Sequence, residues 1–105
     1  MIYRVILHAP APDDEDAALE RVRAALERSG IQPDELRVED WHEGGRAFHI
    51  EAGVEAPSSY HATQVSAPEL FQSPLIEAEI GIEGERIDFV AQRYDDDRPA
   101  HRHEA

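Results

Sequence analysis

The residues best suited to chemistry are one histidine and two glutamates in a stretch of alternating polar and apolar positions. His49 and Glu51 share one face of a predicted strand, and Glu39 lies on the strand expected to pair with it. Imidazole nitrogens and carboxylate oxygens bind divalent ions, and a histidine beside a carboxylate can relay a proton. The same side chains can equally be solvated groups on a polar sheet face, because no spacing here is diagnostic of a metal motif.

The other histidines are weaker candidates. His42 lies beside the predicted turn, where the preferred pairing sets it opposite Arg46, and His8 ends the first predicted strand, where it suits a satisfied core residue. His101 and His103 lie in a polar tail, which can bind a metal loosely or remain solvated. His49 and His42 are thus weak candidates for metal ligands, and no cofactor is expected.

Established catalytic motifs do not occur. The chain has no cysteine, which excludes thiol nucleophiles, disulfides and cysteine-based zinc sites. No helix start follows Gly44-Gly45, so this pair does not form a phosphate-binding loop, and neither Ser58 nor Ser66 lies in a nucleophile elbow. These observations favour a protein that is not an enzyme.

The first two elements are a strand and a helix. Residues Ile2–His8 are mostly apolar and predict a strand buried on both faces. Asp13 predicts the start of a helix as its N-cap, and Gly30 predicts its end, with Ile31 closing on Leu26 in a Schellman motif. The apolar stripe of this helix consists of Ala18, Leu19, Val22, Ala25 and Leu26.

The stretches Leu36–His42 and Arg46–Val54 predict a hairpin. A two-residue loop at Gly44-Gly45 would turn the aliphatic residues of the first strand outward. A three-residue loop that also includes Glu43 pairs Val38 with Ile50 and turns these residues toward the core, so we prefer it.

The preferred register places Trp41 on the opposite face, with Arg37, Glu39 and His49. An exposed tryptophan rimmed by charged residues is typical of a protein interface. Alternatively, a helix or the tail covers this face, and Trp41 belongs to a second small core.

The C-terminal part predicts a short helix and a second hairpin. Ser66-Ala67-Pro68-Glu69 matches a capping box, so a helix is expected from there through Gln72. Alternation over Ile76–Ile82 and Ile87–Ala91 predicts two strands joined at Glu83-Gly84. This register sets Glu79 opposite Asp88 on the outer side, which Glu77 shares, and like charges directly opposed are destabilising.

These elements predict a two-layer α+β fold. Their order is β-α-β-β-short α-β-β, which gives one mostly antiparallel sheet of about five strands with one long helix on a face. The order is compatible with a variant of the ferredoxin-like arrangement. Residues 1–94 are expected to form the single domain, and residues 95–105 a flexible, acidic tail that contains two histidines.

The charge is the outstanding property of the chain. Ten basic residues, all arginine, stand against twenty-three acidic ones, which gives a net charge of −13. Between Ala47 and Glu85 the chain has seven glutamates and no basic residue. Such a surface repels nucleic acids and anionic membranes and attracts cationic surfaces. Met1–Leu7 predicts a strand rather than a signal peptide, and no apolar run is long enough to cross a bilayer, so a soluble cytoplasmic protein is expected.

Three functions fit these properties. The first is an acidic protein-binding module that docks on a cationic, nucleic-acid-binding surface of another protein, as antitoxins, immunity proteins and phage anti-defence proteins do. The second is a small regulatory, ligand-binding or assembly domain whose acidity is an adaptation to high salt. The third is a metal-dependent enzyme that uses His49 and nearby carboxylates. A homodimer through exposed strand edges is compatible with any of them. The residues expected to contact a protein partner are Glu39, Trp41, Glu51, Glu77, Glu79 and Asp88.

Overall fold

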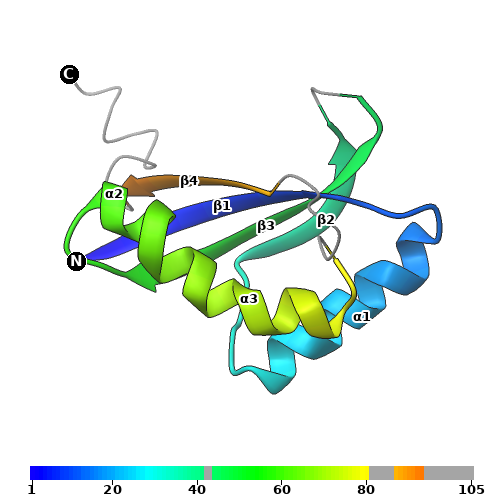
Figure 1. Cartoon of the computed structure of the whole chain (residues 1–105), viewed down its shortest axis with the longest axis horizontal. Coiled ribbons are helices and arrows are strands. Elements are labelled where there is room, and N and C mark those ends of the chain that lie inside the picture. The colour runs from blue at the N-terminus through cyan, green and yellow to red at the C-terminus, as the bar shows by residue number, and fades with distance from the viewer. Residues whose placement is uncertain (42–43, 81–86, 94–105) are drawn as a thin grey trace.

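The computed structural model describes residues 1–41, 44–80 and 87–93. Within these ranges the protein is an α+β fold with one four-stranded antiparallel sheet and two helices (Figure 1). The strands are β1 (Ile2–Pro10), β2 (Glu35–Asp40), β3 (Arg46–Glu55) and β4 (Asp88–Arg93). The first helix is α1 (Glu15–Arg28), and the second is a continuous helical stretch made of α2 (Ser59–His61), the π-helical turn η1 (Ala62–Ser66) and α3 (Ala67–Glu77).

The sheet has the order β2-β3-β1-β4, and each neighbouring pair is antiparallel. Both helices lie on the same face of the sheet (Figure 1). The core lies between the helices and the sheet. Its largest fully buried side chains are Val5, Leu7, Val22, Leu26, Phe48, Ile50, Phe71 and Pro74. The opposite face, called the outer face below, carries the alternate strand residues, and no helix of the described chain covers it. Its residues include Arg4, Ile6, His8, Glu35, Arg37, Glu39, His49, Glu51, Asp88 and Val90.

The end of α1 confirms the predicted Schellman motif. Gly30 has a φ of 77°, which a residue without Cβ adopts at little cost. Its N–H donates to the carbonyl of Glu27 at 3.0 Å, and the N–H of Ile31 donates to the carbonyl of Leu26 at 2.9 Å. These two hydrogen bonds define the motif and satisfy carbonyls that the helix itself leaves unpaired.

The start of α1 differs from the prediction by one residue. The helix begins at Glu15, so Asp14 occupies the N-cap position instead of Asp13. The side chain of Asp14 makes no capping hydrogen bond and instead accepts one from Arg21 at 3.1 Å. The negative charges of the first turn still favour the helix through its dipole.

The first hairpin keeps the predicted faces but not the predicted register. Val38 lies opposite Phe48 instead of Ile50, which shifts the pairing by two residues. The longer connection is closed by a hydrogen bond from the N–H of Trp41 to the carbonyl of Gly45 at 2.9 Å. Since side chains alternate with a period of two, a shift of two residues leaves each side chain on its expected face.

The predicted strand that begins at Ile76 is wrong, because α3 continues five residues beyond Gln72 to Glu77. The buried residues here recur at helical spacing, and they are Ala67, Phe71, Pro74, Leu75 and Ala78. Ile76, predicted to begin an alternating strand, is 57% exposed. The alternation of Ile76, Ala78 and Ile80 therefore coincides with a helical pattern that fills the core better.

No glycine marks the end of α3. Glu79 takes the left-handed conformation there, with a φ of 64°. Its N–H donates to the carbonyl of Ile76 at 3.0 Å, and the N–H of Ile80 donates to that of Leu75 at 2.8 Å. This is a second Schellman motif, formed by a residue that seldom occupies the position.

The predicted C-terminal hairpin is replaced by a different pairing. β4 lies beside β1, where Asp88 is opposite His8 and Phe89 is opposite Leu7. Glu79 belongs to no strand, so the expected pairing of Glu79 with Asp88 does not form. The expected turn at Glu83-Gly84 lies outside the described residues. The sheet of the described chain therefore has four strands instead of about five.

Among the helices of the described ranges, none has the length and apolar character that crossing a bilayer requires.

Candidate functional site

Three strands bring their polar side chains together at the centre of the outer face. His49 in β3 lies directly opposite His8 in β1 on one side and Arg37 in β2 on the other. Glu39 and Glu51 are each two residues away from this row and share its face. Because cross-strand neighbours on one face lie only about 5 Å apart, this pairing forces the side chains into contact.

The two imidazole rings are hydrogen-bonded to each other. Nε2 of His8 lies 2.8 Å from Nδ1 of His49, and the rings meet edge to face. His49 is 7% exposed, although it belongs to the outer face. A buried imidazole needs partners for both nitrogens, and this ring has them.

Glu51 determines which nitrogen of His49 carries the proton. An oxygen of its carboxylate lies 2.6 Å from Nε2 of His49. An ionised carboxylate can only accept a hydrogen bond, so Nε2 of His49 is its donor, and in the neutral form of the ring Nδ1 is the acceptor. The other carboxylate oxygen accepts from Arg4 at 3.2 Å. Glu51 is thereby held between a cation and the ring that it orients.

Glu39 completes the cluster from β2. Its Oε2 lies 3.4 Å from Nε2 of His8 and 3.5 Å from Nδ1 of His49, while Oε1 accepts from Arg37. Partial desolvation raises the pKa of Glu39, but the hydrogen bond from Arg37 and the charges of His49, Arg37 and His8 outweigh it and lower the pKa below its usual value. With Oε1 held by Arg37, the carboxylate of Glu39 directs its other oxygen, Oε2, at the two imidazole nitrogens.

A second group of donor atoms lies on the other side of His49. Nε2 of His49 is 2.6 Å from Glu51 and 3.9 Å from Glu35. Arg4 contacts Glu51, and Arg37 contacts both Glu35 and Glu39, so each group contains arginine-paired carboxylates. The first group, which we call the His8–Glu39–His49 cluster, offers two imidazole nitrogens where the second offers one, so it is the better site for a transition-metal ion.

The structure brings together three of the predicted site residues, namely Glu39, His49 and Glu51. It also adds His8, which was predicted to be a core residue, and the cations Arg4 and Arg37. The alternation of Arg4, Ile6 and His8 with buried neighbours in β1 was the available signal. It shows that β1 is buried on one face and only partly on the other, whereas the prediction buried both.

The other predicted residues lie elsewhere. Glu77 is in α3 and forms an ion pair with Arg28 of α1, and Glu79 follows α3 and is exposed. Asp88 begins β4 on the outer face, and Trp41 follows β2 and is half-buried. His42, His101 and His103 lie outside the described residues.

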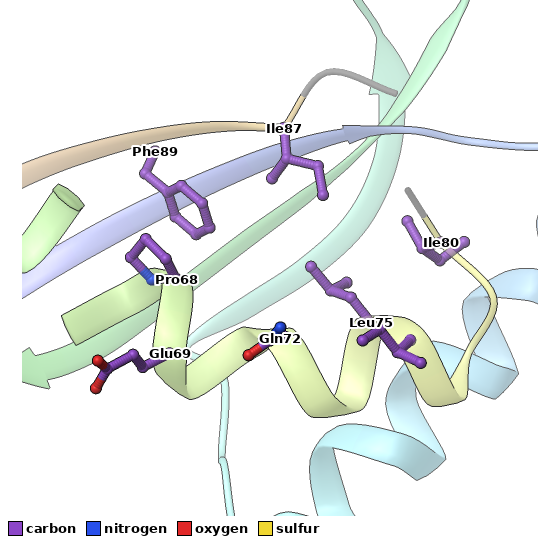
Figure 2. A pocket seen from close by; sticks show the side chains of 8 residues that line it. Pro68, Glu69, Gln72, Leu75, Ile80, Ile87 and Phe89 are labelled. Atoms are coloured by element: carbon purple, nitrogen blue, oxygen red, sulfur yellow. The ribbon is translucent and has the colours of Figure 1, made fainter. Parts of the chain in front are cut away.

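A separate apolar pocket of about 410 Å³ lies between α3 and β4. Figure 2 shows Ile87, which precedes β4, and Phe89 of β4 above α3, with Leu75 and Ile80 facing them. Glu69 is the one titratable residue in its described lining. This lining can contact an apolar molecule, but it lacks the convergent polar groups that the outer face provides.

No family model, curated protein or solved structure matches this chain. The function must therefore be inferred from the geometry of the residues themselves.

Proposed function

We propose that this protein binds a divalent transition-metal ion, Zn²⁺ by preference, on the outer face of its sheet through Nε2 of His8, Oε2 of Glu39 and Nδ1 of His49. The observation that carries the proposal is the convergence of these three donor atoms from three different strands. They lie 2.8 to 3.5 Å from one another.

The separations agree with a tetrahedral ion. Zn²⁺ bonds to nitrogen and oxygen are about 2.0–2.1 Å long, which places ligand atoms about 3.4 Å apart. Glu39 is at 3.4 and 3.5 Å from the two imidazole nitrogens. Nε2 of His8 and Nδ1 of His49 are 2.8 Å apart, which is a hydrogen-bond distance. These two nitrogens need to separate by about half an ångström when an ion binds between them.

The environment of His49 supports the same proposal. Histidines that bind metals almost always donate their other ring N–H to a carboxylate or a carbonyl, which fixes the tautomer and the ring orientation. Glu51 accepts that bond from Nε2 of His49 at 2.6 Å. Nδ1 of His49 is therefore presented to the cluster with its lone pair available once the proton of His8 leaves.

The donor set favours zinc and its neighbours over magnesium and calcium. Two imidazoles and one carboxylate suit Zn²⁺, Cu²⁺, Co²⁺ or Ni²⁺, whereas Mg²⁺ and Ca²⁺ prefer oxygen ligands. We therefore expect millimolar Mg²⁺ or Ca²⁺ not to compete with Zn²⁺ for the cluster.

The test is Zn²⁺ binding by calorimetry with the full chain, first stripped with a chelator. We expect one ion to bind the His8–Glu39–His49 cluster, and His8→Ala and Glu39→Gln each to weaken its binding by at least about tenfold. Both residues are partly exposed, with side chains 22% and 33% accessible, so these variants are expected to fold. His61→Ala is the matched control, because His61 is half-buried, lies in α2 and belongs to neither group of donor atoms found among the described residues.

Binding by the tail must be separated from binding by the cluster. A full chain with His101→Ala and His103→Ala should retain the site. If this variant loses Zn²⁺ binding, or if His8→Ala and Glu39→Gln bind as well as the wild type, the proposal is wrong.

A second proposal is docking on a cationic surface of another protein. It is supported by the net charge of −13 and by the exposed side of α1, which carries Asp16, Glu20 and Glu27, with Arg23 paired to Glu20. We expect Asp16→Arg with Glu27→Arg to abolish capture of a basic partner that the wild type retains. Glu39→Gln should leave that capture intact. Equal capture by the wild type and the double variant would contradict docking through α1.

We also propose that the fold is a ferredoxin-like arrangement. The support is the order of elements, β-α-β-β-α-β, together with the antiparallel strand order β2-β3-β1-β4. An experimental structure of this protein tests the proposal. It should show the same connectivity, with a right-handed crossover from β1 through α1 to β2, and a left-handed crossover would contradict it.

A further inference from the structure

We infer that an ion in the His8–Glu39–His49 cluster keeps one exchangeable coordination position, which faces solvent and takes a small neutral Lewis base such as water, an amine or an imidazole. This inference rests on the proposed metal binding and deepens it. It makes the site an open one, able to hold a ligand, instead of a closed structural site.

The number of donors leaves the position open. Among the described residues, this cluster has three donor atoms within 4.8 Å of one another, whereas Zn²⁺ takes four ligands in most sites. The carboxylate of Glu51 lies at Nε2 of His49, on the opposite side of the ring from Nδ1, so it cannot bind the same ion. Glu35 lies on that opposite side as well.

The direction of the open position follows from the exposure of the ligands. His49 forms the buried floor of the cluster, while the side chains of His8 and Glu39 are partly exposed above it. Both helices lie on the other face of the sheet (Figure 1). The side of the ion away from the sheet is therefore the side toward solvent.

The surrounding charge determines the class of ligand. Glu35, Glu51 and Asp88 lie on the same face as the cluster, and the whole chain carries a charge of −13. Arg4 and Arg37 hold carboxylates of this face. The two charges of the ion and the two guanidinium groups offset the four carboxylates of this face, counting Glu39, so the negative charge that remains belongs to the rest of the chain. An incoming anion therefore meets a net negative field and engaged guanidinium groups, whereas a neutral donor meets neither obstacle.

The experiment uses Co²⁺ in place of Zn²⁺, because the visible absorption of Co²⁺ reports its coordination. The Co²⁺-loaded full chain is titrated with imidazole at about pH 8, where the free base predominates, and separately with thiocyanate. We expect imidazole to change the Co²⁺ spectrum saturably. Thiocyanate should bind at least about tenfold more weakly at low ionic strength, with the difference narrowing when perchlorate screens the charge.

The outcomes separate this inference from the metal proposal. If Co²⁺ binds but its spectrum responds to neither ligand, a further group of the chain closes the site, and the inference fails while metal binding stands. If thiocyanate binds as tightly as imidazole at low salt, the ligand class is wrong. If Co²⁺ does not bind, or if its spectrum is the same in His8→Ala, metal binding itself fails.

Discussion

The carboxylate of Glu51 lies 2.6 Å from Nε2 of His49 and simultaneously accepts a hydrogen bond from Arg4 at 3.2 Å. The side chain of Glu51 is only 14% exposed, so water does not readily replace it. Glu51 thus connects the guanidinium of Arg4 to the imidazole of His49 at the centre of the outer face. It leaves Nδ1 of His49 directed at His8 and Glu39, which is the orientation that a metal ligand needs.

Removal of Glu51 should therefore weaken metal binding although it does not touch the ion. We expect Glu51→Ala to lower the affinity for Zn²⁺ by about 10–100-fold, the usual effect of losing the partner that orients a ligand. Glu51→Gln keeps an acceptor for the ring N–H and should recover part of the loss. Calorimetry measures the affinities, and nitrogen NMR of His49 reports which ring nitrogen carries the proton in the metal-free protein.

The matched control for Glu51 is Glu35→Gln, because Glu35 lies 3.9 Å from the same nitrogen. The affinity of this variant for Zn²⁺ should stay within about threefold of the wild type, because Glu35 makes no hydrogen bond to His49 and the amide oxygen of glutamine can still accept from Arg37. An equal loss for Glu35→Gln and Glu51→Ala would indicate a general effect of negative charge. An unchanged tautomer of His49 in Glu51→Ala would contradict the positioning role.

The helix at residues 67–77 makes a prediction that the rejected strand does not. Phe71 is fully buried and Ile76 is 57% exposed in the same helix. We expect Phe71→Ala to lower the free energy of unfolding by about 3–5 kcal/mol. Ile76→Ala should change it by less than about 0.5 kcal/mol, as substitutions at exposed positions usually do. Denaturant unfolding measures both changes in the free energy of unfolding. A large loss of stability in Ile76→Ala would contradict the helix and support the predicted strand.

The end of α3 offers a stabilising substitution. Glu79 has a φ of 64°, a conformation that costs a residue with Cβ roughly 1 kcal/mol and glycine almost nothing. We expect Glu79→Gly to raise the free energy of unfolding by about 0.5–1 kcal/mol. Glu79→Ala removes the same charge without relieving the backbone, so it controls for electrostatics. An equal gain in both variants would assign the effect to charge.

Salt dependence should reveal the self-repulsion of the acidic chain. We expect the melting temperature to rise from about 20 mM to about 1 M KCl as the Debye length shortens. Glu27→Gln, in the last turn of α1 where a negative charge also opposes the helix dipole, should raise it at low salt and have little effect at high salt. A cooperative melt that is insensitive to salt would contradict self-repulsion as a determinant of stability and weaken the interpretation of the acidity as salt adaptation.

Local elements with strong chemical signals were predictable from the sequence. The end of α1 is one of them, because Gly30 accepts the left-handed conformation and Ile31 follows it. The faces of the first hairpin are another, because a period of two survives an error of two residues in register. His49 and Glu51 share a face because of that period, and Glu39 joins them because the preferred pairing and the observed one differ by an even number of residues.

The C-terminal part was not predictable in the same way. Residues 71–80 contain an alternating pattern and a helical pattern at once, and Glu79 ends the helix without the glycine that would mark it. Local preferences cannot decide between such patterns, because the difference lies in which side chains find a core to fill. Phe71 and Leu75 fill it only when the helix packs beside α1 and the sheet.

The sequence by itself determined the composition of this protein, its charge, its long helix and the outward side of each strand in the first hairpin, since these depend on residue type and spacing. Tertiary structure alone decided that β1 lies between β3 and β4, and hence that His8 meets His49 at 2.8 Å. Residues 41 positions apart come into contact only through strand order and register. Both are set by the burial of the whole sheet against its helices, which no local pattern encodes.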